Sequence, residues 1–145
     1  KIIIRVRRFF MADFGSTFYL IIFIINLFFL SFYSVLIIFN PKKLITDYEF
    51  GDDAMQAVRL IGSFIIPLVL IGIYLLFTSV VGAWIYFVLG TMISIYQLGY
   101  DFGTRMKIFD SSYKIINQTQ DTVIAIAFVA INLTLLFGMQ DIIFA

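Results

Sequence analysis

Long uncharged apolar runs separated by short polar segments dominate this chain. The first run, residues 17–39, contains 23 residues and no charge. As a helix it would rise about 34 Å, enough to cross a hydrocarbon core of about 30 Å. Ser16 or Thr17 can cap its start, and Asn40-Pro41 ends it because the residue before proline avoids helical geometry. The run is too long for a signal-peptide core, so it predicts an uncleaved span.

A second apolar stretch, residues 58–100, has its only charge at its very start. Its 43 residues would form a helix about 64 Å long, roughly twice the thickness of a membrane. It must therefore fold back, and the predicted turn lies at residues 77–79, between helices at about 54–77 and 80–100. Pro67 inside the first of these helices removes one backbone hydrogen bond and predicts a kink.

A last span is predicted at about residues 122–144, with Asp121 as its cap. The largest polar segment, residues 101–121, separates it from the span before. In residues 1–16, three basic side chains would share one helix face opposite isoleucine and phenylalanine, which predicts a short amphipathic interfacial helix; a basic juxtamembrane tail is the alternative. The expected fold is one all-α domain, residues 1–145: a polytopic membrane protein with four transmembrane helices in an up-down bundle.

Composition supports the membrane assignment. Hydrophobic residues make up 62% of the chain and charged residues 13%, with a mean hydropathy of +1.04. Soluble domains are about half apolar and about a quarter charged, so lipid is the expected solvent. The net charge of +1 gives no reason to expect a nucleic-acid partner. The abundance of isoleucine and phenylalanine fits an A/T-rich genome, and hence a multi-pass protein of a bacterial or organellar inner membrane.

Orientation depends on how the basic residues are weighed. The side with the termini carries Lys1, Arg5, Arg7 and Arg8. The side with the two polar loops carries Lys42, Lys43, Arg59, Arg105, Lys107 and Lys114. A plain count places the loops in the cytoplasm, whereas the dense cluster before the first span, which often dominates, places the termini there. We expect the termini on the cytoplasmic or matrix side.

Cysteine and histidine are both absent. Their absence removes thiolate chemistry, Fe–S clusters, the usual haem ligand and the commonest general base. We therefore predict no catalytic, cofactor-binding or metal-ligating residue. Acidic residues fall in predicted loops or at span ends, which argues against a proton pump, since such proteins bury carboxylates in the bilayer. They are Asp13, Asp47, Glu49, Asp52, Asp53, Asp101, Asp110 and Asp121, together with Asp141 in the final turn of the last span.

Polar residues recur every seven positions on the first span, at Tyr19, Asn26 and Tyr33. They share one helix face, and a polar side chain inside the bilayer normally faces other protein. Together with Asn132 in the last span, they are a possible intramembrane polar site for a ligand or an ion. The alternative is a role in helix packing only, and we favour it.

Small residues at four-residue steps predict close helix packing. Gly82, Tyr86, Gly90 and Ser94 form such a row on the third span, and Ala130, Thr134 and Gly138 form another on the last. We expect these two faces to meet each other or a partner. The bulky phenylalanines of the first span should then point outward, to lipid or to another subunit. They are Phe18, Phe28, Phe29, Phe32 and Phe39.

Three short motifs together resemble the DoxX-like group of small four-helix membrane proteins. The first span ends in Phe39-Asn40-Pro41-Lys42, a short loop contains Gly51, and Arg59-Leu60-Ile61-Gly62 opens the second span. A tight hairpin, a polar loop and a final span complete the plan, which covers about residues 17–140. The resemblance implies a four-helix membrane fold and transfers no functional residue to this chain.

Two functions remain open from the sequence. The first is a non-catalytic integral membrane subunit, an accessory or structural component that packs against other membrane proteins in a larger complex. The second is a protein that binds or transports an apolar small molecule, such as a lipid or a quinone, near Asn26 and Pro67. A membrane enzyme ranks third, because no acid–base constellation supports it.

Overall fold

The computed structural model describes residues 13–110, 112 and 118–145, and within them every regular element is a helix. This confirms the all-α prediction. The amphipathic helix predicted for residues 1–16 lies largely outside the described residues, as does part of the 101–121 loop. The helices are α2 (Thr17–Phe39), α3 (Pro41–Asp47), the 3-10 turn η1 (Asp52–Ala54), α4 (Met55–Phe77), α5 (Trp84–Arg105), α6 (Gln118–Gly138) and α7 (Gln140–Ile143).

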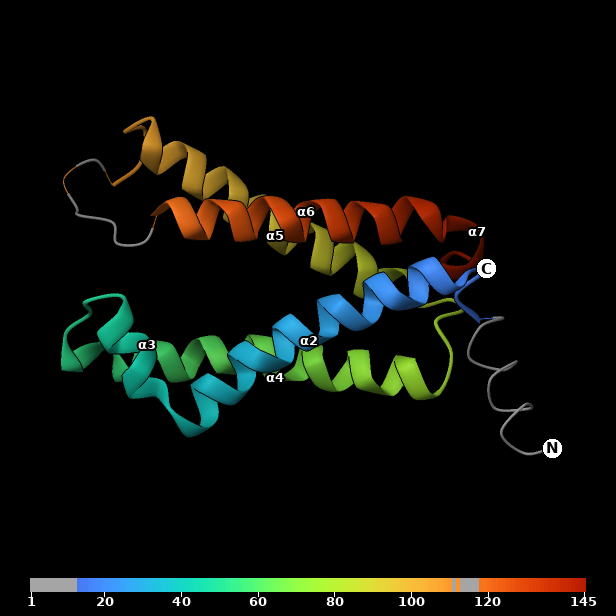
Figure 1. Ribbon diagram of the computed structural model, residues 1–145, viewed down its shortest axis with the longest axis horizontal. Helices are drawn as coiled ribbons and strands as arrows, with labels where there is room; N and C mark the ends of the chain where they lie inside the picture. The colour runs from blue at the N-terminus through green and yellow to red at the C-terminus, as the bar shows by residue number, and fades with distance from the viewer. Residues whose placement is uncertain (1–12, 111, 113–117) are drawn as a thin grey trace.

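The long helices run lengthwise through the molecule (Figure 1). At one end lie α3, the end of α5 and the start of α6, and we call it the α3 end. At the other, the α7 end, lie the start of α2, the α4–α5 connection and α7. Helix α5 packs mainly on α6, and α2 packs on both α4 and α6, whereas α4 and α5 make much less contact with each other.

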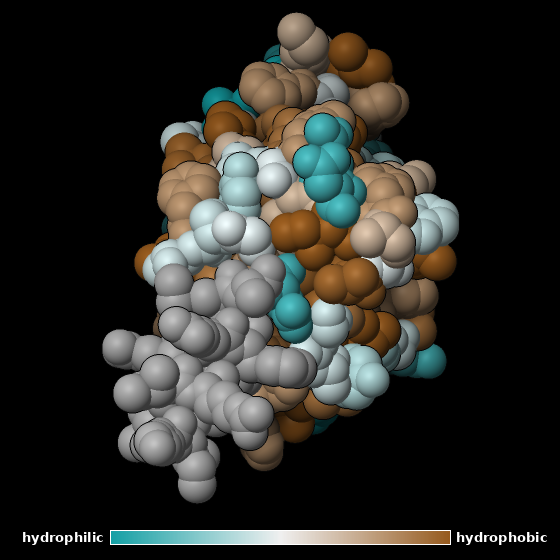
Figure 2. All heavy atoms as spheres, turned by 90° about the vertical axis from the view of Figure 1, so that its right-hand side faces the viewer, coloured by the Kyte–Doolittle hydropathy of each residue, from teal (hydrophilic) through white to brown (hydrophobic). Residues whose placement is uncertain are grey.

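Three of the described helices are long and apolar enough to cross a membrane: α2, α4 with the preceding 3-10 turn, and α6. Only 22–28% of the most apolar window of each is buried inside the protein. Viewed from the α7 end, hydrophobic side chains reach the surface around much of the molecule (Figure 2). Apolar surface on this scale needs lipid or other protein to cover it, so the chain has the character of an integral membrane protein.

The ends of α2 follow the local sequence signals. The Ser16 side chain accepts a hydrogen bond from the backbone N–H of Tyr19 at 3.3 Å, as expected of an N-cap. The helix stops at Asn40, and Pro41 opens α3 as its first residue. Residues 78–83 form the predicted turn, where Gly82 has a φ of +74° and donates its backbone N–H to the Ile142 carbonyl at 3.3 Å.

The predicted boundaries of two helices are wrong. The third helix runs from Trp84 to Arg105 instead of from about 80 to 100, and within it Gln97 donates a hydrogen bond to Asp101 one turn further on. The last helix begins at Gln118, so Asp121 lies in its first turn and does not cap it. That helix also ends early, at Gly138, and the short helix α7 follows it.

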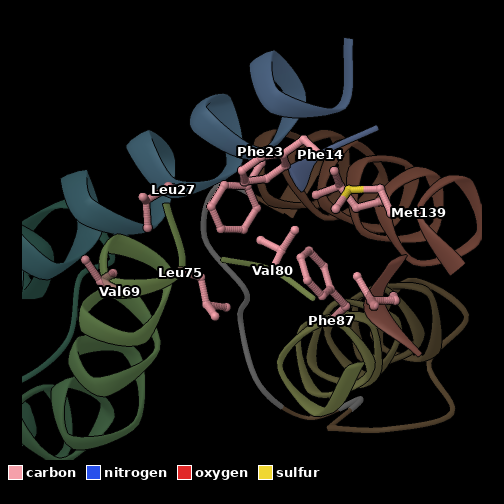
Figure 3. Packing of buried hydrophobic residues seen from close by; sticks show 10 residues of the cluster. Phe14, Phe23, Leu27, Val69, Leu75, Val80, Phe87 and Met139 are labelled. Carbon is pink, nitrogen blue, oxygen red and sulfur yellow. The ribbon is translucent and has the colours of Figure 1, made fainter. Parts of the chain in front are cut away.

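Aromatic and aliphatic side chains form the main core at the α7 end (Figure 3). The Phe23 ring is fully buried, and its centroid lies 5.2 Å from that of Phe14 and 5.8 Å from that of Phe87. Val80, from the α4–α5 turn, lies in the same cluster. The five α2 phenylalanines predicted to point outward are all exposed, and Phe28 is the second most exposed of them at 67%.

Phe23→Ala should lower the free energy of unfolding by about 3–5 kcal/mol, because it removes a ring from a closed core. Phe28→Ala, on the same helix, should change it by a few tenths of a kcal/mol at most, since that ring has little protein around it. Unfolding of the detergent-solubilised chain, followed by circular dichroism, compares the two. Equal losses for both variants would contradict this packing.

Candidate functional site

A pair of buried asparagines joins α2 to α6. The Asn26 Nδ2 donates a hydrogen bond to the Asn132 Oδ1 at 3.3 Å, and the Asn132 Nδ2 donates to the Phe128 carbonyl at 2.9 Å. Both side chains are at least 93% buried. Asn26 Oδ1 is buried and lacks a hydrogen-bond partner among the described residues. The structure thus brings together two residues of the predicted polar site, and one acceptor of the pair stays unpaired.

Gly90 on α5 provides the space in which Asn132 sits. A Cβ atom at Gly90 would lie 2.9 Å from Asn132 Oδ1, so any larger side chain would press on the asparagine pair. Ser94, one turn further on, is buried and donates its hydroxyl to the Thr91 carbonyl at 2.9 Å. The predicted small-residue face of the third helix therefore lies at the contact of α5 with α6.

The other predicted packing residues lie elsewhere. Gly138 lies under the ring of Tyr19, which belongs to α2 and not to α5. Thr134 is half-buried, and Ala130 is exposed on the surface of this chain. Gly82 is exposed in the α4–α5 turn, where its positive φ explains the glycine. Tyr19 and Asn26 of the predicted polar row on α2 therefore have different neighbours: Tyr19 packs on Gly138 toward the α7 end, and Asn26 pairs with Asn132 at mid-helix.

A second polar cluster occupies the α3 end, at the junction of α5 and α6. Asp101 is 5% exposed, and its Oδ1 accepts a hydrogen bond from Gln97 Nε2 at 3.1 Å. Its Oδ2 is buried without a partner among the described residues. Across from it, Asp121 Oδ1 accepts a hydrogen bond from the Tyr48 hydroxyl at 2.9 Å. Arg105 Nε donates to Thr122 Oγ1 at 3.1 Å, which ties the two helices together.

Tyr48 follows α3 and reaches the cluster from the loop between α3 and α4. Burial raises the pKa of its hydroxyl well above the usual range, and the hydrogen bond to Asp121 raises this pKa further. The phenol therefore stays protonated and acts as a donor. Tyr33, the last of the predicted polar row on α2, lies within electrostatic range of Asp121. Residues from α2, α5, α6 and the α3–α4 loop thus converge here.

Sequence reasoning placed Asp101 and Asp121 in the polar loop or at a span end and did not connect them. A signal was present: Thr91, Ser94, Asp101 and Thr104 recur at helical spacing, and all four are buried. Two carboxylates, an amide, a phenol and a guanidinium can bind a small cation or a polar group. The described residues hold no group of three or more acidic, histidine or cysteine side chains suited to a metal ion.

No protein-family model, curated protein or solved structure matches this chain. The resemblance to the DoxX-like group stays a prediction.

Gly90→Leu should lower the free energy of unfolding by about 1–3 kcal/mol, because the added side chain must displace Asn132 and separate α5 from α6. Gly99→Leu on the same helix is the matched control, since nothing lies within 4 Å of a Cβ there. The midpoint of thermal unfolding in detergent measures both. A Gly90→Leu protein as stable as the Gly99→Leu control would contradict this close packing of α5 against α6.

Proposed function

We propose that this chain is a four-span, non-catalytic subunit of a larger membrane protein complex, with α5 as the fourth span beside α2, α4 and α6. The 22 residues of α5 would rise about 33 Å, which is long enough to cross. Four of its polar residues, Thr91, Ser94, Asp101 and Thr104, are buried, whereas Gln97 and Arg105 near its end are exposed. Its exposed side is largely apolar, with Leu89, Met92, Ile93, Ile95 and Tyr96 at the surface. Such a helix would expose its apolar side to lipid and pack its polar side against other helices.

The observation that carries the subunit proposal is the exposed phenylalanine face of α2. Phe28, Phe32 and Phe39 are all more than half exposed, and Phe28 and Phe29 meet edge to face with ring centroids 6.0 Å apart. Aromatic side chains bury large areas and are enriched at protein interfaces. A row of them along one helix offers a partner helix a broad surface for packing. The partners would be other membrane proteins, with lipids covering the remainder.

A second candidate function is binding of an apolar small molecule with one polar donor, such as a lipid or a quinol. The unpaired Asn26 Oδ1 favours it, because this acceptor could receive a hydrogen bond from such a ligand. Pro67, which the sequence suggested as a second wall of the site, is exposed on the outer side of α4. The subunit proposal therefore takes precedence.

We infer a bacterial or organellar inner membrane as the location, with the termini on the cytoplasmic or matrix side.

The four-span topology predicts on which side of the membrane single cysteines become labelled. The chain has no native cysteine, so Lys42→Cys, Val81→Cys and Met106→Cys each give one reporter at an exposed position. With four spans, Cys-reactive, membrane-impermeant maleimide should label positions 42 and 106 from one side and position 81 from the other. Labelling of position 106 from the same side as position 81 would mean three spans, with α5 not crossing.

Replacing both Phe28 and Phe32 by alanine should release the chain from its complex while leaving its helix content unchanged. The pair Leu60→Ala and Phe64→Ala is the matched control, because these side chains are equally exposed on α4. Affinity purification in mild detergent, followed by measurement of subunit stoichiometry, compares the two. If the native chain purifies alone as a monomer or homo-oligomer, the subunit proposal is wrong and the small-molecule alternative is favoured.

A further inference from the structure

The cluster at the α3 end contains a buried carboxylate with one oxygen that nothing described in the structure satisfies. Asp101 is 95% buried, and Gln97 occupies only its Oδ1, leaving Oδ2 without a donor. Burying an ionised carboxylate without full pairing is costly, so such a group either binds a proton or holds a cation. Of the two buried oxygens without a partner in the described part of the chain, this is the one that belongs to an ionisable group, so it has the greater need of a proton or a cation.

The charges around Asp101 do not balance. Asp121, from α6, acts on Asp101 as a neighbouring negative charge, and Arg105 acts on it as a positive one. Among the described residues, two carboxylates and one guanidinium leave one unit of negative charge. The other described titratable groups at this site are the phenols of Tyr33 and Tyr48, of which Tyr48 stays protonated, and the nearby Asp47 forms a salt bridge with Lys43 at 2.7 Å. One monovalent positive charge would neutralise the cluster.

We propose that Asp101, together with Asp121, binds one monovalent cation, either a proton or a sodium ion, at the α3 end of the helices. A proton would convert the free Oδ2 into a hydrogen-bond donor. A sodium ion would take this oxygen as a ligand. A divalent metal ion fits less well, because the excess charge is a single unit and the described residues provide no third acidic ligand.

This site is independent of the subunit proposal, because it lies among α5, α6 and the α3–α4 loop and not on the exposed face of α2. Asp101 lies near the end of α5, at a span end as the sequence predicted, but its burial makes it an interior carboxylate.

The test uses the full chain, purified in sodium-free detergent. Sodium chloride should raise the midpoint of thermal unfolding by about 5 °C over choline chloride at equal ionic strength, if the ion is sodium. If it is a proton, infrared spectra at neutral pH should contain the C=O band of a protonated carboxyl group that shifts on ¹³C labelling of aspartate. Asp101→Asn should abolish whichever signal the native chain gives, and Asp52→Asn, at an exposed carboxylate, should preserve it.

The native chain alone decides the matter if the Asp101→Asn variant does not fold. A native protein with neither the sodium effect nor the protonated carboxyl band would overturn the proposal. So would either signal persisting unchanged in a folded Asp101→Asn protein.

Discussion

Moving an apolar side chain from lipid into a contact between helices gains no hydrophobic free energy, because lipid tails are equally apolar. The association of helices in lipid therefore depends on close packing and on hydrogen bonds. Four contacts between the described long helices have a glycine at which a side chain of the neighbouring helix comes close. A Cβ atom at Gly62 or Gly72 would lie within 3 Å of a side chain on another helix, as at Gly90. The pairs are Gly62 with Ile37, Gly72 with Tyr86, Gly90 with Asn132, and Gly138 with Tyr19. They join α4 to α2, α4 to α5, α5 to α6, and α6 to α2.

The interior of the described helices is also partly polar, and α5 supplies half of its eight buried polar residues. The hydroxyls of Thr91, Ser94 and Thr104 donate hydrogen bonds to backbone carbonyls of α5 itself, so they need no partner on a neighbouring helix. Asn26 and Asp101 are different, because each keeps a buried oxygen unpaired. The interior is therefore polar without being fully satisfied, and the unsatisfied positions are where chemistry beyond packing is to be sought.

Much of the helical layout could be predicted because it depends on local signals. The Ser16 cap, the stop at Asn40-Pro41 and the turn after Phe77 each follow from a few neighbouring residues. The sequence indicated that the buried amides of Asn26 and Asn132 need polar partners, and the structure pairs them with each other. Helix faces were harder to predict, since a four-residue spacing identifies a row but not the helix it meets: Ala130 is exposed.

The acidic cluster was missed for a related reason. Hydropathy averages a segment over all its faces, so the polar side chains of α5 lowered its apolar character and made residues 101–105 resemble a loop. Burial is a property of one face, and it places Asp101 inside while Phe102, the next residue, is exposed. The same averaging kept α5 out of the set of helices apolar enough to cross a membrane. Of the two charged residues of α5, Asp101 is buried and Arg105 is exposed. The face on which a charge lies therefore carries more information about this chain than the number of charges.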